Sequence, residues 1–300
     1  MSQAPLAEAP RPLAGEAGAG DGGSNGPAAE IVRKDAALRA LLGEWPSLIV
    51  AYSGGVDSAY LAYAAHRALG ASALAVTADS PSYPERHRAI ALRLAREFGF
   101  NHLVIQTAEM ARPEYRANPA NRCYYCKHEL YTHLTTIASE RGIPVIADGS
   151  NADDRGDYRP GRQAAREFGV HSPLDEAGLT KNEIRELSRR AGLPTWDEPA
   201  SACLSSRIPY QSEVTVAKLS MIEQAEDALR RHGFRVCRVR HHDTVARLEI
   251  GRDEMARALD PDISAALVRE LKAIGYQYVS LDLQGYRTGS LNEILTLRPV

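Results

Sequence analysis

The sequence lacks the long apolar segments of a membrane protein and the charge excess of a dedicated nucleic-acid binder. None of its apolar runs approaches the roughly 20 residues that a bilayer-spanning helix needs. With 36 Lys and Arg against 38 Asp and Glu, the net charge is −2, so nothing draws the whole chain towards nucleic acid or anionic lipid. A local basic patch would be enough to bind RNA, so this balance disfavours a nucleic-acid partner without excluding it. We expect a globular protein with no membrane partner.

The first 30 residues, MSQAPLAEAPRPLAGEAGAGDGGSNGPAAE, lack the basic start and apolar centre of a signal peptide. They are rich in Ala, Gly and Pro and nearly free of large apolar side chains, so we expect residues 1–30 to form a disordered tail. We therefore expect a cytoplasmic location, where thiols stay reduced. In that setting the four cysteines point to a metal site or to catalysis before disulfides.

From residue 31 onwards the apolar pattern alternates between helix and strand. The expected strands are 47–53, 71–80, 102–109 and 144–151, and the expected helices are 31–45, 57–69, 83–99 and 123–142. This alternation predicts an α/β fold, a parallel sheet with helices on both faces. Ligands of such sheets bind beyond the C-terminal ends of the strands, where the segments SGGVDS, TADS and DGSN all fall.

The pattern changes after TWDEPASACLSSRIPY (195–210), a segment with three prolines and little periodicity. A helix is expected before it at 180–194. After it we expect helices at 213–234 and 265–276, and strands within 235–251 and 278–287. We therefore divide the chain into a larger α/β domain at 31–207 and a smaller α+β module at 208–300.

The stretch SGGVDS, residues 53–58, follows the first expected strand and opens the next helix. It has neither the G-x-x-x-x-G-K-[ST] spacing of a Walker loop nor the G-x-G-x-x-G pattern of dinucleotide sites. Gly54 and Gly55 let backbone N–H groups turn towards an anion at a helix N-terminus, and the Ser53 and Ser58 hydroxyls can donate to phosphate oxygens. Asp57 would repel bare phosphate, so its expected role is to bind Mg²⁺. The alternative is a plain strand–helix turn with the Asp or a Ser as the helix N-cap.

Three of the four cysteines stand where a metal or redox site can form. Cys123 and Cys126 make a C-x-x-C at the start of an expected helix, where the helix dipole is expected to lower the thiol pKa, and Cys203 lies near the domain boundary. Two ligands make a poor zinc site, whereas three thiolates with an open fourth position suit a [4Fe–4S] cluster. The alternative is a redox pair of Cys123 and Cys126 with Cys203 as a separate nucleophile. Cys237, in an alternating strand, is expected to be a packed residue.

The loop SGGVDS resembles the pyrophosphate-binding loop of the PP-loop ATP pyrophosphatases, also called adenine nucleotide alpha hydrolases. Members cleave ATP between its α and β phosphates, adenylylate an acceptor oxygen, and let a nucleophile displace AMP. With NPANRCYYCK, DGSNADDRGDYRPGRQAAREFGVHSPL, LTKNEIRELSRRAGLPTWDEPASACLSSRIPY and RVRHHDTVARLEI, residues 31–300 are similar to the LarE family. The resemblance implies a homo-oligomeric, ATP-dependent sulfur transferase, with residues 31–207 as its ATP-binding PP-loop domain and residues 208–300 as a module that binds substrate or mediates oligomerisation. Its substrate would be pyridinium-3,5-biscarboxylic acid mononucleotide, whose carboxylates become thiocarboxylates for the nickel-pincer cofactor.

The same resemblance implies one of two sulfur sources. In one type a lone cysteine, matching Cys203, surrenders its own sulfur and ends as dehydroalanine. In the other, three cysteines carry a [4Fe–4S] cluster that presents an extra sulfide. Because Cys123 and Cys126 accompany Cys203, the chain resembles the cluster type, with ATP, Mg²⁺ and the cluster as its cofactors. Sacrifice of Cys203 is the alternative.

Further candidate residues follow the strands or flank the cysteines. The TADS segment, where the superfamily contacts adenine or ribose, contributes Thr77 and Ser80; the alternative is a Ser/Pro turn. The DGSNADD segment contributes Gly149, Asn151 and Asp154 as candidates to contact nucleotide, Mg²⁺ or substrate, although such turns are common at strand ends. The expected substrate-binding residues are Arg122, Arg207, Arg238 and Arg240, the last two on one strand face in the segment where the resemblance places substrate-phosphate arginines.

Three other functions compete with a small-molecule sulfur transferase. A tRNA thiolase uses the same ATP chemistry, but the net charge of −2 and the compact C-terminal module disfavour it. An amide-forming ligase that uses ammonia needs no cysteine trio. A non-catalytic nucleotide- or metal-sensing module would bind ATP without releasing pyrophosphate when offered an acceptor.

Overall fold

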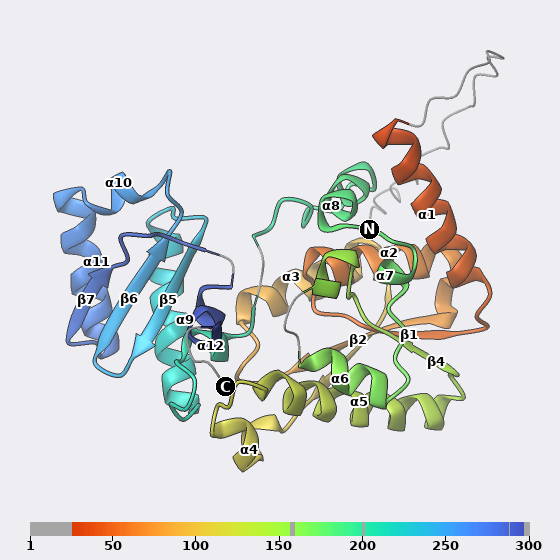
Figure 1. The fold of residues 1–300 in the computed structure, drawn as a ribbon, viewed down its shortest axis with the longest axis horizontal. Coiled ribbons are helices and arrows are strands. Elements are labelled where there is room, and N and C mark those ends of the chain that lie inside the picture. Colours follow the sequence, from red (N-terminus) through yellow and green to blue (C-terminus); the bar gives the residue numbers. More distant parts are fainter. Residues whose placement is uncertain (1–25, 157–159, 200–201, 288, 297–300) are drawn as a thin grey trace, which may run out of the picture.

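Two β-sheets, each with its own helices, make up the protein (Figure 1). The structure is a computed structural model that describes residues 26–156, 160–199, 202–287 and 289–296. Of the expected tail, residues 1–25 lie outside the described residues. The first helix, α1 (Pro27–Gly43), begins four residues earlier than expected, because a proline at the first helical position suits a helix start.

The larger sheet is parallel throughout, as the alternation of strands and helices predicts. Its strands are β1 (Leu48–Ala51), β2 (Ala73–Asp79), β3 (Asn101–Gln106) and β4 (Val145–Ala147), in the order β3-β2-β1-β4. β1 pairs with both β2 and β4 in parallel register. The direction in which the chain adds strands reverses at β1, so the C-terminal end of β1 lies at the switch point where such sheets bind ligands.

Helices cover both faces of this sheet, which confirms the predicted α/β class. One face packs against α1, α2 (Val56–Leu69), α3 (Glu85–Glu97), α7 (Pro173–Glu176) and α8 (Lys181–Arg190). The other packs against α5 (Arg122–Arg141) and α6 (Gly161–Glu167). Leu48 and Val50 of β1 belong to the first core and Ile49 and Ala51 to the second, as expected for a strand whose successive side chains point to opposite faces.

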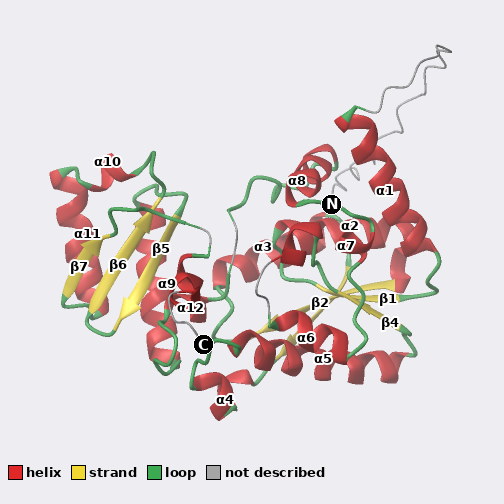
Figure 2. Cartoon of the chain, viewed as in Figure 1, coloured by secondary structure: helices red, strands yellow, loops and turns green. Residues whose placement is uncertain are grey.

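The smaller C-terminal module contains the second sheet, with strand order β5-β6-β7 (Figure 2). Strands β5 (Cys237–His242) and β6 (Val245–Ile250) form an antiparallel hairpin, and β7 (Tyr278–Leu281) pairs with β6 in parallel. Helices α9 (Val216–Arg231) and α11 (Pro261–Ile274) pack with these strands in a separate core. The predicted α+β module is therefore present.

A short 3₁₀ helix, η4 (Leu204–Arg207), joins the two parts where the domain boundary is predicted. Leu204 packs with Ile222 of α9 and with Tyr115 of α4 (Pro113–Arg116) in a fourth cluster. The backbone N–H of Leu204 also donates to the Ser82 carbonyl at 2.9 Å. The segment that carries Cys203 is thus attached to both parts.

Several short elements lie outside the expected pattern. Helices α4, α6, α7, α10 (Met255–Ala258) and α12 (Glu293–Thr296) have seven residues or fewer, too few to show a helical period. The last expected strand, 278–287, is strand over Tyr278–Leu281 alone. Within the described ranges, no helix combines the length and apolar character needed to cross a bilayer.

Candidate active site

The loop after β1 has the close backbone packing that its two glycines predict. Gly54 has φ +67°, and a Cβ there would lie 2.9 Å from the Ala91 Cβ of α3, so only glycine fits without a shift. Ser58 accepts from the Ser53 N–H at 3.1 Å, and their hydroxyls lie 3.0 Å apart. The N-cap of α2 is Gly55, with no side-chain cap. The alternative of a turn capped by Asp or Ser is therefore wrong, and the N-terminus of α2 opens towards this loop.

The end of β4 lies directly against the start of α2. A Cβ on Gly149 would lie 2.9 Å from the Ser58 backbone nitrogen, so this glycine allows the two segments to meet. Nearby, the Lys181 ammonium at the start of α8 forms an ion pair with the Asp57 carboxylate. Asp57, the expected Mg²⁺ ligand, is therefore paired with Lys181 in this structure. The predicted site residues did not include this lysine.

The two candidates after β2 make contacts inside the protein. Thr77 is buried, and its hydroxyl donates to the Tyr52 carbonyl at 2.8 Å. Ser80 donates to the carboxylate of buried Glu109 at 2.5 Å. These hydroxyls fix the loop at the strand end, and their contact with adenine or ribose stays a prediction.

The segment after β4 forms a turn closed by its own polar side chains. The Asn151 side chain accepts from the Asp153 N–H at 3.0 Å, and Asp154 accepts from the Asn151 N–H at 3.1 Å. Asn151 and Asp154 are both buried. The turn follows β4 and leads to the start of α8, because Asp153 in turn accepts from the Lys181 N–H at 2.8 Å. It thus places Lys181 beside the loop after β1.

The structure brings Cys203 to the start of α5, where Cys123 and Cys126 lie. Buried Arg122 donates to the Ser205 carbonyl at 2.9 Å and to the Asn118 side chain. The Asn118 amide donates in turn to the Pro209 carbonyl at 2.7 Å. These bonds fasten the η4 segment to α5. Arg122, expected to bind substrate, therefore has a structural role in this state.

The thiols of the three cysteines are close enough to influence one another. Burial raises the pKa of the Cys123 thiol, the Arg122 guanidinium lowers it and Cys203 raises it further. Burial also raises the pKa of Cys126, with Glu109 and the other two cysteines acting in the same direction. The expectation of lowered pKa values in the C-x-x-C is thus wrong, because burial and neighbouring negative charge outweigh a helix N-terminus.

These cysteines bear on the predicted iron–sulfur cluster in two ways. Their chemistry fits, since three thiols from two segments share one neighbourhood and soft thiolates suit iron–sulfur clusters. Their positions do not yet form a ligand set: within the part of the chain that the structure describes, no three His, Cys, Asp or Glu side chains are grouped to hold a metal ion. The cluster and Mg²⁺ therefore stay predictions.

Arg207 lies at the centre of the domain junction. Its guanidinium donates to both carboxylate oxygens of Glu226 on α9, at 2.7 and 3.1 Å, and to the Cys203 carbonyl at 3.1 Å. Burial alone would raise the pKa of Glu226, but Arg207 and Arg230 hold that pKa below its ordinary value. Arg207 was expected to bind substrate. In the structure it fixes the backbone at Cys203.

The two arginines on β5 differ in their surroundings. Arg240 donates to Glu249 at 2.8 Å and to the Ser206 carbonyl at 2.6 Å, so it too is engaged within the protein. Arg238 lies over the Tyr286 ring, 5.0 Å from its centroid, and lines a pocket. Burial, with the neighbouring Arg207 acting in the same direction, lowers the pKa of Arg238 to about 10.

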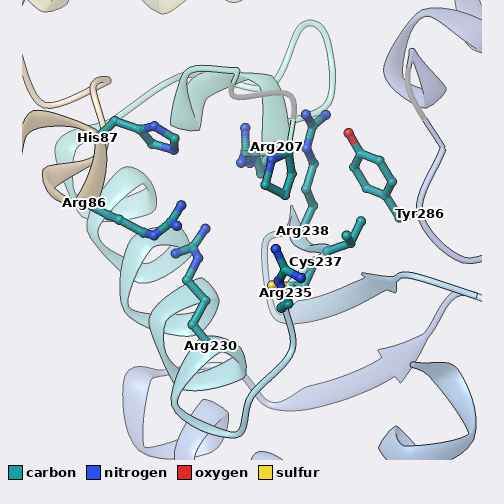
Figure 3. Close-up of a pocket in the computed structure, with 10 residues that line it drawn as sticks. Arg86, His87, Arg207, Arg230, Arg235, Cys237, Arg238 and Tyr286 are labelled. Atoms are coloured by element: carbon teal, nitrogen blue, oxygen red, sulfur yellow. The ribbon is translucent and has the colours of Figure 1, made fainter. Parts of the chain in front are cut away.

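That pocket, which we call the arginine pocket, lies between α3, η4 and the C-terminal module. Figure 3 shows side chains from α3 and from the C-terminal module directed towards its centre. Its lining residues are Arg86, His87, Pro199, Arg207, Arg230, Arg235, Val236, Cys237, Arg238 and Tyr286. Five guanidinium groups around one cavity favour an anionic ligand, and phosphate suits the fork geometry of arginine.

Carboxylates from the neighbouring segments offset part of this charge. Glu226 and Asp227 pair with Arg230, each at 2.9 Å. Asp197 and Glu198 pair with Arg235 and Arg86, at 2.9 and 2.8 Å. Cys237 is buried, as expected for a packed residue, and burial raises the pKa of its thiol to about 12. Of the residues that line the pocket, the predicted substrate-binding set included Arg207 and Arg238 but neither Arg86 nor His87.

Comparison with known proteins adds independent information. No family model matches the chain. The chain is 45% identical over 259 residues to an uncharacterised protein of Synechocystis sp., covering 86% of this chain and 97% of that protein. It is 34% identical over 269 residues to pyridinium-3,5-bisthiocarboxylic acid mononucleotide synthase of Lactiplantibacillus plantarum, covering 89% and 97%. It is 28% identical over 201 residues to one subunit of the glutamine-hydrolysing GMP synthase of Methanopyrus kandleri, covering 59% and 60%.

The parallel sheet, the glycine loop at its switch point and the likeness to the GMP synthase polypeptide define a fold of the PP-loop type, with a smaller C-terminal module. The likeness to the Lactiplantibacillus synthase is more specific, because it extends over nearly the whole of both chains. The chain belongs to the LarE family. The family expected from the sequence motifs is therefore confirmed.

Proposed function

We propose that this protein is an ATP-dependent sulfur transferase acting on pyridinium-3,5-biscarboxylic acid mononucleotide, in biosynthesis of the nickel-pincer cofactor. A carboxylate oxygen of the acceptor attacks the α-phosphorus of ATP, the bond to the β-phosphate oxygen breaks, and pyrophosphate leaves. A sulfur nucleophile then attacks the acyl carbon and AMP leaves, which gives a thiocarboxylate. Support comes from membership of the LarE family and from the name of the Lactiplantibacillus relative.

The loop of Ser53, Gly54, Gly55, Asp57 and Ser58 would bind the β and γ phosphates of ATP. The N–H groups that the first turn of a helix leaves without intrahelical partners, together with the helix dipole, favour an anion there. Lys181 neutralises Asp57, so this carboxylate repels the triphosphate less than an unpaired one would. Mg²⁺ would enter with ATP, with Asp57 as a candidate oxygen ligand.

The observation that carries the proposal is the position of Arg207. One guanidinium donates to the Cys203 carbonyl at 3.1 Å and also lines the arginine pocket. A mononucleotide whose phosphate lies beside Arg238 would therefore be held next to the segment of Cys203. Acceptor and sulfur donor would be held close together, which replaces a bimolecular encounter by an oriented one.

Cys123, Cys126 and Cys203 would hold the [4Fe–4S] cluster, which when bound supplies a sulfide for transfer. The chain's own contribution is to hold the three thiols together through Arg122 and η4. Arg122 also lowers the pKa of Cys123 against the effect of burial, which favours the thiolate. In the alternative route, Cys203 gives up its own sulfur and leaves dehydroalanine.

The test is a reaction with ATP and the biscarboxylate mononucleotide, followed by assay of pyrophosphate, AMP and, by mass, the thiocarboxylate. We expect pyrophosphate release to require the acceptor and to fall about tenfold or more in Asp57→Asn, because Mg²⁺ would lose a charged oxygen ligand. Cys203→Ser should abolish thiocarboxylate. ATP binding without acceptor-dependent pyrophosphate release would refute the proposal.

The sulfur source is tested separately by the iron and acid-labile sulfide content of anaerobically purified protein. About four irons per chain, lost in Cys123→Ser and in Cys203→Ser, would support a three-thiolate cluster. Protein without iron after reconstitution, with a Cys203 peptide that loses H₂S on turnover, would support the sacrificial route. Light scattering during size-exclusion chromatography tests the expected homo-oligomer.

A further inference from the structure

His87 is a titratable group of the arginine pocket to which the proposed chemistry gives no role. It lies on α3, its side chain lines the pocket, and it is 8% exposed. In Figure 3 its imidazole points into the same cavity as the guanidinium groups of Arg86 and Arg230. The ring is therefore within the space that an anion would occupy.

The charges around His87 come from three elements. Arg86 lies beside it on α3, Arg230 and Glu226 face it from α9, and Arg207 faces it from η4. Burial, with Arg86, Arg230 and Arg207 acting in the same direction and Glu226 opposing, lowers the pKa of His87 to about 4. The imidazole of the ligand-free protein is thus neutral near pH 7.

A bound phosphate monoester would add negative charge beside His87. It brings close to two negative charges at pH 7, since its second pKa is near 6. An anion within a few ångströms favours the charged form of a histidine, and a charged N–H donor binds phosphate oxygen more strongly than a neutral one. A ligand with a single negative charge would offset much less of the positive charge that Arg86, Arg207 and Arg230 place around His87.

We propose that His87 is a further anion-binding residue of the arginine pocket, one that takes up a proton as a phosphate monoester dianion enters and then donates to it as an imidazolium. This inference rests on the proposed function, since it takes the phosphate of the mononucleotide acceptor as the natural ligand. It makes the pocket select doubly charged phosphate esters over singly charged groups of the same shape.

The sign of the linkage follows from where the proton is bound. His87 binds it in the complex and releases it in the free protein, so affinity for phosphate monoesters rises as pH falls towards 7. Below about pH 6 the ligand itself takes up a proton and loses charge, so affinity falls again. In a His87 variant, the rise in affinity towards pH 7 should disappear, and the fall in affinity below about pH 6 should remain.

The experiment is calorimetric titration of the full-length protein with ribose 5-phosphate, with the loop after β1 occupied by a non-hydrolysable ATP analogue. Titrations at pH 7 in buffers of different ionisation enthalpy give the number of protons taken up. We expect the wild type to take up about half a proton or more. His87→Gln should exchange no proton beyond the contribution of the phosphate itself, and its affinity should be up to about tenfold lower, because a charge-assisted hydrogen bond is lost. The ionisation of the phosphate contributes equally to both proteins and cancels in the difference.

Two comparisons sharpen the result. His133→Gln, which changes a partly exposed histidine on α5 outside the pocket, should behave as wild type. Ribose 5-sulfate, an isostere that stays singly charged, should bind wild type about tenfold more weakly than the phosphate and without proton uptake. Binding of ribose 5-phosphate to wild type without proton uptake overturns the role of His87, whether or not the variant folds. Failure of wild type to bind it at all overturns this role and the assignment of the pocket, while the acceptor-dependent release of pyrophosphate decides the function independently.

Discussion

Replacing Glu226 by glutamine tests whether a buried carboxylate fixes the domain junction. Glu226 is 1% exposed and accepts from Arg207 at 2.7 and 3.1 Å, from Arg230 at 2.9 Å and from the Val239 N–H at 3.3 Å. Glutamine keeps the shape and one acceptor oxygen. It removes the negative charge and turns an amide N–H₂ towards an arginine.

The expected loss of stability is large because two arginines lose their shared anion. Removing one partner of a buried ion pair costs about 3–5 kcal/mol, since the remaining charge stays buried without compensation. A folded domain is stable by about 5–15 kcal/mol, so Glu226→Gln should remove a large part of the stability at this junction. The Cys203 carbonyl, held by the same guanidinium at 3.1 Å, should become mobile.

Urea denaturation measures the first effect, and the alkylation rate of Cys203, followed by peptide mass, measures the second. We expect the denaturation midpoint to fall and Cys203 to react about tenfold faster or more, because local opening becomes easier. The matched control is Asp227→Asn, the adjacent residue, whose carboxylate is 47% exposed and pairs with Arg230; it should cost about 1 kcal/mol or less. Equal, small effects of the two substitutions would refute the reasoning.

Three further predictions concern the glycine loop and the arginine pocket. Gly149→Ala places a Cβ 2.9 Å from the Ser58 nitrogen and should destabilise the protein by about 1–3 kcal/mol, with a smaller thermal shift on addition of ATP; an unchanged melting temperature would contradict this packing. Lys181→Met leaves Asp57 without its ammonium partner beside the triphosphate, so calorimetry should show ATP binding weakened about tenfold or more, whereas Lys272→Met should have no effect. Because the pKa of His87 lies near 4 in the folded protein and near 6.5 in the unfolded chain, the unfolded chain binds this proton first as pH falls. Stability should therefore decline below pH 6.5, by about 2 kcal/mol at pH 5, and His87→Gln should remove that part of the decline in urea titrations.

The fold was predictable because its signals are local. The strand–glycine–helix order around Gly54 predicts a loop at a sheet edge, and the structure has it there with φ +67° at this glycine. The periodicity of the longer helices and strands likewise predicts both sheets, including the parallel order of the first. Helices of four residues span barely more than one turn, too little to show the helical repeat, and they escaped prediction.

The roles of the charged residues were less predictable because their partners are distant in the sequence. Lys181 meets Asp57 across 124 residues, and no spacing rule relates the two. From the sequence, Arg207 beside Cys203 is expected to bind substrate, and Glu226 on a polar helix is expected to be solvated. The fold instead buries both side chains in one ion pair. His87 lies in an amphipathic helix among other polar residues, so its place in the pocket depends on the docking of the C-terminal module against α3.

The surroundings of Cys126 bear on the choice between the two sulfur sources. If Cys203 alone gave up its sulfur, the reaction would need neither Cys123 nor Cys126, yet the fold places all three thiols where they affect one another. Cys126 also lies near the buried carboxylate of Glu109, which raises the pKa of its thiol further. Burial and this carboxylate oppose ionisation of the Cys126 thiol, and a bound metal centre would offset that opposition by taking the place of the proton. The sacrificial route asks nothing of this thiol, so the iron and acid-labile sulfide content of the purified protein decides between the two sources.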